Sequence, residues 1–78
     1  MARIIVEDLK REDKTRNQIH EVAHATFTTF QINDESFFQL DTYGSNSREN
    51  PEKVSQSIQI DRQSALAFVD IIKRELSL

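Results

Sequence analysis

The fold is decided by residues 37–72, FFQLDTYGSNSRENPEKVSQSIQIDRQSALAFVDII. The stretch predicts a strand, a long polar loop, a second strand and a capped amphipathic helix. Val54, Ile58 and Ile60 point to one side of the second strand, with Gln56 as the exception in their row. Alternation with period two and β-branched residues is typical of a half-buried strand. The pattern therefore predicts a sheet with one apolar face.

The helix is expected at residues 61–78. Asp61 can accept hydrogen bonds from the backbone N–H groups of the first turn and is the expected N-cap. At 100° per residue, one apolar stripe contains Ala65, Phe68, Val69, Ile72 and Leu76. Leu66 and Ile71 flank this stripe, so the apolar arc spans about 220°. Because that arc is wider than one sheet face needs, the helix is either sunk deeply into its own core or shared with a second subunit.

The first half of the chain adds two further strands. A short strand is predicted within residues 3–9, followed by a charged turn or mobile arm at 10–16. β-formers dominate residues 26–32, and the NDES turn at 33–36 pairs them in a hairpin with residues 37–43. The expected fold is α+β, an antiparallel four-stranded sheet followed by one C-terminal amphipathic helix, in the order β-β-β-β-α.

A chain of 78 residues is expected to be a single domain, with a strand and charged arm in 1–16 and the sheet and helix in 17–78. A domain of this size buries only about 60% of the surface that its unfolded chain exposes. The chain has no cysteine, so no disulfide can compensate, and association is the usual remedy. We therefore expect a homodimer. Its interface is predicted to contain Leu66, Phe68, Ile71 and Ile72.

The charge balance is mildly acidic, since 10 Lys and Arg residues stand against 13 Asp and Glu residues, a net charge of −3. This argues against a strong general affinity for nucleic acid. The start, MARIIVEDLK, has no long apolar core of the signal-peptide type, and no run approaches the roughly 20 apolar residues of a membrane span. A cytoplasmic protein without a membrane partner or a cofactor is the expectation.

The sequence HEVAH at 20–24 matches the zinc-peptidase pattern H-E-x-x-H through His20, Glu21 and His24. On a helix, the two histidines would face one zinc ion, and the glutamate would act as general base on its bound water. The following residues, ATFTTF, favour a strand, and no second motif supplies a third ligand. We therefore predict two histidines without a metal and no enzymatic activity, with a zinc-dependent hydrolase as the alternative.

Residues 26–76 resemble the positive-cofactor-four family of single-stranded-DNA-binding proteins. The resemblance lies in FFQLDTYG, the long polar loop, and SIQID leading into RQSALAFVDII. It implies a hairpin, a further strand pair and a C-terminal helix, assembled as a homodimer through the helices, with basic and aromatic strand residues contacting the nucleic acid. Tyr43 matches the aromatic position. Gln56 and Ser57 stand where Lys-Gly ends the loop in the family, and Thr42 stands where an arginine is common.

Two binding functions follow. In the first, a homodimer binds single-stranded nucleic acid on its exposed sheet face, where rings stack on bases and polar or basic groups contact phosphates. The residues predicted for this site are Phe37, Tyr43, Arg48, Lys53, Ser55, Ser57 and Gln59. In the second, the chain is a protein-interaction adaptor without nucleic-acid affinity, which the acidic net charge favours. The loop at 44–53 is predicted to be mobile, because it is polar and has no apolar anchor.

Overall fold

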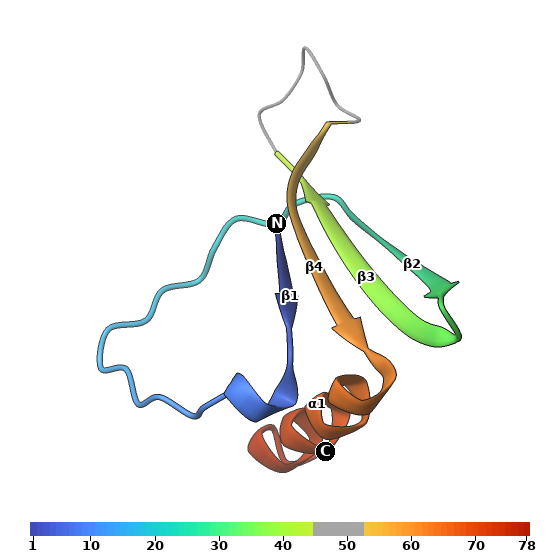
Figure 1. Cartoon of the computed structure of the whole chain (residues 1–78). Coiled ribbons are helices and arrows are strands. Elements are labelled where there is room, and N and C mark those ends of the chain that lie inside the picture. The colour runs from blue at the N-terminus through green and yellow to red at the C-terminus, as the bar shows by residue number, and fades with distance from the viewer. Residues whose placement is uncertain (45–52) are drawn as a thin grey trace.

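The computed structural model describes residues 1–44 and 53–78 and contains one sheet and one α-helix (Figure 1). Its elements are β1 (Ala2–Ile4), the 3-10 helix η1 (Val6–Asp8), β2 (Ala25–Ile32), β3 (Glu35–Tyr43), β4 (Val54–Asp61) and α1 (Arg62–Glu75). The strands lie side by side in the order β1-β4-β3-β2. The predicted α+β class, the four-stranded sheet and the C-terminal helix are confirmed. The loop predicted to be mobile, with Arg48, lies outside the described residues except at its two ends.

The sheet is mixed, so the prediction of a wholly antiparallel sheet was wrong at one edge. The pairs β2–β3 and β3–β4 are antiparallel. β1 runs parallel to β4, with Ala2 opposite Ile58 and Ile4 opposite Ile60. Residues 9–24 carry the chain from β1 around to the far edge of the sheet (Figure 1). Because this connection is long, β1 can run in either direction relative to the hairpin. The short apolar run in β1 does not indicate whether the strand pairs parallel or antiparallel to its neighbour.

The hairpin of β2 and β3 closes through the predicted turn. Asn33 and Asp34 have φ angles of 52° and 63°, and a two-residue type I′ turn requires positive φ at both central positions. Asparagine and aspartate are among the few non-glycine residues that tolerate this conformation. The turn sets the register, which places Phe30 opposite Phe37.

The register separates the sheet into an apolar face and a polar face, because residues directly opposite on neighbouring strands share a face. The apolar face is formed by Phe27, Phe38, Leu40, Ile58 and Ile60. The polar face is formed by Phe30, Phe37, Gln39, Asp41, Ser57 and Gln59. Ile58 and Ile60 therefore share one side of β4, as the alternation of that strand predicts.

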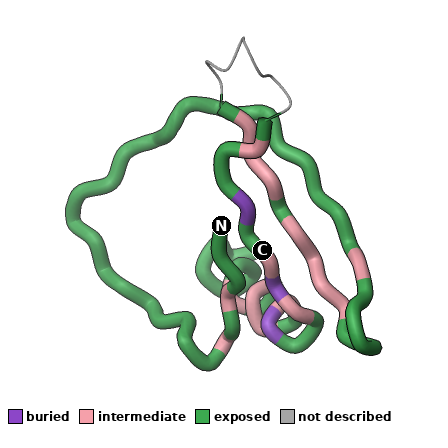
Figure 2. The backbone as a smooth tube through the Cα atoms, turned by 45° about the horizontal axis from the view of Figure 1, so that its top comes forward, coloured by how far each residue is buried: buried purple, intermediate pink, exposed green. Residues whose placement is uncertain are grey.

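The helix α1 starts at the end of β4 and turns away beneath the sheet (Figure 1). The predicted N-cap is confirmed, because Oδ1 of Asp61 accepts a hydrogen bond from the Ser64 backbone N–H at 2.7 Å. In the part of the chain that the structure describes, buried positions are confined to β4 and the start of α1 (Figure 2). Among the described residues, Ile60 is the only large hydrophobic side chain that is buried, at 9% exposure. No helix in the described ranges is long and apolar enough to cross a membrane.

The side of α1 that packs against the rest of the chain is not the centre of the predicted apolar stripe, but a side further around the helix. Ser64 is buried, and Phe68 and Ile71 are half-buried, whereas Val69 and Leu76 are 54% and 66% exposed. The contact side faces η1 and the ends of β3 and β4. The reason is a contact with the N-terminal segment, since the Ser64 hydroxyl accepts a hydrogen bond from the Val6 backbone N–H at 2.9 Å.

The cap at Asp61 makes the stability of the fold depend on pH. The Ser64 backbone N–H and, to a smaller extent, Arg3 hold the pKa of the Asp61 carboxyl below its ordinary value. A carboxyl whose pKa is lowered on folding contributes stability above its unfolded pKa of about 3.9, and this is lost as pH falls through the folded pKa. The same sign applies to Glu75, whose pKa is lowered by Arg11.

We therefore expect the thermal midpoint to fall as pH drops from about 5 to about 2. Asp61→Asn should flatten part of this fall, because asparagine also caps helices but carries no titratable proton. Glu75→Gln is the matched control, and it should leave the part due to Asp61 in place. Thermal unfolding followed by circular dichroism measures both. An Asp61→Asn variant with the full wild-type pH dependence would contradict the expectation.

Candidate binding surfaces

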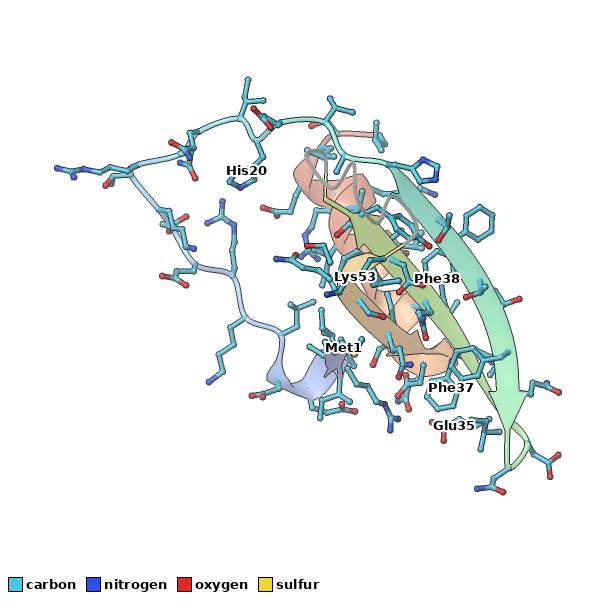
Figure 3. The ribbon with its side chains drawn as sticks, turned by 90° about the horizontal axis from the view of Figure 1, so that it is seen from above. Met1, His20, Glu35, Phe37, Phe38 and Lys53 are labelled. Carbon is cyan, nitrogen blue, oxygen red and sulfur yellow. The ribbon has the colours of Figure 1, made fainter. Side chains whose placement is uncertain are left out.

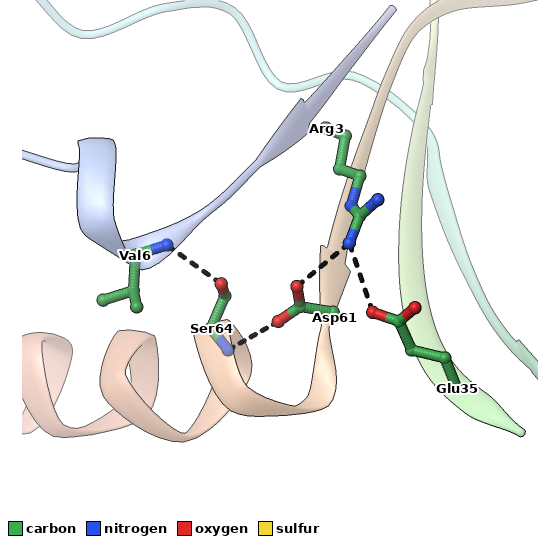
Figure 4. Close-up of polar contacts among 5 residues, drawn as sticks. All are labelled: Arg3, Val6, Glu35, Asp61 and Ser64. Atoms are coloured by element: carbon green, nitrogen blue, oxygen red, sulfur yellow. Dashed lines mark hydrogen bonds and ion pairs between the residues drawn. The ribbon is translucent and has the colours of Figure 1, made fainter.

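One end of the polar face is held together by Arg3 (Figure 4). Its Nη2 donates hydrogen bonds to Oδ2 of Asp61 at 3.1 Å and to Oε1 of Glu35 at 3.2 Å. The guanidinium carbon also lies 5.0 Å from the centre of the Phe37 ring, and the Phe30 ring stacks on Phe37 with centroids 5.3 Å apart. Because β1 and β2 lie on opposite sides of β3, Phe37 is flanked by a cation on one side and a ring on the other.

The middle of the polar face is a row of hydrogen-bonded amides. Gln59 donates from Nε2 to Oε1 of Gln39 at 2.8 Å. Gln39 donates in turn to both carboxylate oxygens of Asp41, each at 3.1 Å. Ser57 lies opposite Asp41 and is buried. Because Gln59, Gln39 and Asp41 already hydrogen-bond to one another, a ligand at this place has to exchange those hydrogen bonds.

The other end of the polar face is aromatic. The Tyr43 hydroxyl lies 3.2 Å from Oγ1 of Thr26, which places Tyr43 on this face. The rings of His24 and Tyr43 lie with centroids 5.2 Å apart. The polar face therefore offers a ring pair at each end and amides between them.

The structure brings part of the predicted nucleic-acid site together. Phe37, Tyr43, Ser57 and Gln59 share the polar face. Ser55 is exposed and has no residue opposite it, because the register shifts between Thr42 and Tyr43. Lys53 is exposed just before β4, away from Phe37 (Figure 3). Arg48 lies outside the described residues.

Sequence reasoning missed Arg3, the cation that touches Phe37. It comes from a strand that is 32 residues from Glu35 and 58 from Asp61 in the chain. Once β1 is known to pair with β4, the register places Arg3 opposite Gln59 and so on the polar face. The sequence alone carried no signal for that pairing.

The residues of HEVAH lie on neither a helix nor a strand, because β2 begins only at Ala25. The zinc geometry of H-E-x-x-H needs His20 and His24 on one turn of a helix, and this backbone does not provide one. In residues 1–44 and 53–78, no group of three His, Cys, Asp or Glu side chains is arranged to hold a metal ion.

Of the residues predicted for the dimer interface, Phe68 and Ile71 are half-buried within the chain, whereas Leu66 and Ile72 are exposed. The helix therefore presents only part of its apolar arc to the outside.

A second surface is the outer edge of β2, the last strand of the sheet. The Tyr43 backbone N–H donates to the His24 carbonyl at 2.9 Å, so His24 and every second residue after it direct their backbone groups toward β3. The residues between them direct N–H and C=O groups away from the sheet, and these are Ala25, Phe27, Thr29 and Gln31. The strand ATFTTFQI contains no charged residue and no proline.

Comparisons of the chain with protein-family models, with curated proteins and with solved structures gave no match. The polar face and the edge of β2 are therefore the basis for inferring a function.

Proposed function

We propose that this protein is a homodimeric adaptor that binds an extended segment of a partner protein by adding it as a strand to the edge of β2. The observation that carries the proposal is the uncharged outer edge of β2. In strand addition, backbone hydrogen bonds supply the affinity, and alternate side chains supply the specificity.

The edge of β2 lacks the features by which proteins usually prevent strand addition. Edge strands are normally short, or they carry lysine, proline or a bulge. β2 has 8 residues and pairs with β3 without interruption from Ala25 to Ile32. The three threonines of β2 are polar, which favours exposure of the strand to water, and as β-branched residues they also favour an extended backbone. An edge of this kind is a template for pairing with an extended segment of another chain, and an adaptor can use that property.

The test is a selection of peptides from a random display library on immobilised protein, followed by NMR. Bound peptides should protect the amide protons of Ala25, Phe27, Thr29 and Gln31 from exchange and leave those of Thr26 and Thr28 unchanged. Thr29→Pro removes one outward N–H group, so we expect it to weaken peptide binding by about tenfold. Thr29→Ala is the matched control, because it changes the same side chain and keeps the N–H group.

Peptides that bind Thr29→Pro as tightly as Thr29→Ala would overturn strand addition at this edge. Failure to select any peptide would overturn the adaptor function itself. A folded Thr29→Pro variant is expected, because proline is tolerated where the N–H group points out of a sheet, and its circular dichroism spectrum checks this.

A second candidate is the binding of single-stranded nucleic acid on the polar face. The rings of Phe37 and Tyr43 with the amides of Gln39 and Gln59 favour it, since aromatic stacking contributes about 1–3 kcal/mol per base. A base that stacked on Phe37 from the side of β1 would displace Arg3, and the freed guanidinium could then pair with a phosphate. The carboxylates on this face and the net charge of −3 oppose it.

Fluorescence anisotropy with a labelled single-stranded oligonucleotide separates the two candidates. Binding that weakens steeply with salt and shifts the NMR signals of Phe37 and Tyr43 supports the nucleic-acid function. Phe37→Leu removes the ring and should abolish that binding, while peptide binding at the edge of β2 is retained. If the oligonucleotide does not bind at low salt, the nucleic-acid function is excluded and the adaptor function is the one candidate left.

A further inference from the structure

A pocket of about 600 Å³ lies between the end of the sheet where the hairpin turns and the start of α1. Part of its lining is apolar and consists of Phe38 of β3, Ile60 of β4 and Ala65 of α1. Thr29 and Gln31 of β2 line it as well, so the pocket reaches the strand that forms the edge of the sheet. A segment that is added beside β2 would therefore run past this pocket.

The strand register places the pocket on the apolar face of the sheet. Thr29 lies opposite Phe38, and Phe38 lies opposite Ile60, so these three side chains form one row across that face. The next row, nearer the turn, is polar, because Gln31 lies opposite Ser36 and donates a hydrogen bond from Nε2 to its Oγ at 3.2 Å. The apolar row therefore offers a place for an apolar side chain, and the polar row bounds it.

Thr29 is one of the residues of β2 whose backbone groups point away from the sheet. In an added antiparallel strand, the residue opposite Thr29 exchanges backbone hydrogen bonds with it, and its side chain lies on the same face as the pocket. The Phe38 ring leans toward β2, because it stacks on Phe27 with centroids 5.7 Å apart. Since neighbouring strands are about 4.8 Å apart, a long side chain that passes over the short Thr29 reaches this ring.

We propose that the pocket receives one large apolar side chain of the partner segment, at the position opposite Thr29, and that this anchor residue gives the adaptor its specificity. The inference rests on the proposed addition of a strand to β2 and specifies the chemistry of that strand. Phe, Trp, Leu and Met are long enough to pass over Thr29, whereas Ala and Val are not. Alternate side chains that enter pockets are the usual source of specificity in strand addition.

The same register defines a second position in the partner. The residue opposite Phe27 lies two positions from the anchor residue and on the same face. The Phe27 ring is 70% exposed, so a second large apolar side chain of the partner can pack against it. The partner class is then an extended segment with two large apolar residues that are separated by one residue.

A charged anchor residue is disfavoured by the residues around it. Beside Phe38 and Ile60 it would lose water without gaining a hydrogen-bond partner. A basic side chain would also meet Arg62, which lines the pocket. An acidic side chain would start about three strand spacings, roughly 14 Å, from the end of β4 where Arg62 lies, so an ion pair would require both side chains to be fully extended.

The first experiment uses the peptides that are selected on the immobilised protein. In a complex with labelled protein, the anchor residue is the one whose amide proton gives an NOE to that of Thr29. Its side chain should be Phe, Trp, Leu or Met and should give NOEs to the methyl groups of Ile60 and Ala65. Replacing it with alanine should weaken binding by about tenfold to a hundredfold. The matched control replaces the next residue, which lies on the polar face, and should change the affinity by less than about threefold.

The second experiment fills the pocket from the side of the helix. Ala65→Leu should weaken the binding of a peptide with a large anchor residue by about tenfold and leave that of the alanine-anchored peptide unchanged. Ala65→Ser keeps the size of the side chain, so both peptides should bind it as they bind the wild type. Circular dichroism checks that both variants fold, and the peptide substitutions decide the question if Ala65→Leu does not.

The outcomes separate this inference from the proposed function. Peptides that protect the outward amides of β2 but lack a large apolar anchor residue, or lose no affinity when it becomes alanine, would overturn the inference and leave strand addition in place. An equal loss of both peptides with folded Ala65→Leu would also overturn it. If no peptide binds, or if Thr29→Pro binds as tightly as Thr29→Ala, strand addition itself is wrong, and the anchor pocket is wrong with it.

Discussion

Replacing Ile60 with alanine should lower the free energy of unfolding by about 2–4 kcal/mol. Ile60 lies opposite Phe38 on one side and Ile4 on the other, and it lines a pocket between the sheet and the helix together with Ala65 of α1. Three elements of the fold thus meet at one side chain. A domain of this size has a total stability of about 4–12 kcal/mol, so the loss is a large share of it.

Urea denaturation at a fixed protein concentration measures the effect of Ile60→Ala. The control is Ile19→Ala, which makes the same change at a side chain that is 99% exposed, and it should shift the unfolding free energy by less than about 0.5 kcal/mol. If Ile60→Ala were as mild as Ile19→Ala, the chain would have a different core, with Ile60 outside it.

Features that depend on near neighbours in the sequence could be predicted. The Asp61 cap needs only a carboxylate three residues before a backbone N–H group, and the Asn33–Asp34 turn needs only two residues that tolerate positive φ. The opposite orientation of Phe37 and Phe38 follows from period two alone. In each case, the physical cause lies within a few residues of the feature.

Features that depend on distant partners could not be predicted. The parallel pairing of β1 with β4, and with it the place of Arg3 beside Phe37, joins segments at opposite ends of the chain. The polar face could be outlined from Phe37, Tyr43 and Gln59, but the ion-paired Arg3 could not. The backbone groups of β2 that point away from the sheet could be identified only from the register of β2 with β3. The alternation of side chains does not say which residues hydrogen-bond to β3.

The orientation of α1 shows why a wide apolar arc is ambiguous. Its period defines a stripe centred near Val69 and Ile72, but it does not say which part of about 220° meets the chain's own sheet. The outcome is decided by a polar residue, Ser64, which is 3% exposed. Its hydroxyl anchors the Val6 backbone, and Val69, Ile72 and Leu76 are left exposed on another side of the helix.

Loss of that hydroxyl should therefore release β1 and η1 from the helix. Ser64→Ala keeps the backbone bond to Asp61 but leaves the Val6 N–H group without its acceptor. An unsatisfied, partly buried N–H group costs about 1–3 kcal/mol, and we expect a loss of unfolding free energy in that range. Hydrogen exchange should become faster first at Val6. Ser55→Ala, the same change at an exposed serine, should have little effect.

A double-mutant cycle tests whether the Val6 N–H group is the cause. Val6 is the first residue of η1 and follows an extended N-cap at Ile5, a position where proline fits a helix start and where its missing N–H group is tolerated. Val6→Pro removes the donor, so Ser64→Ala should cost much less in the Val6→Pro background than in the wild type. Equal costs in both backgrounds would mean that Ser64 acts through packing alone, and the position of α1 would then need a different explanation.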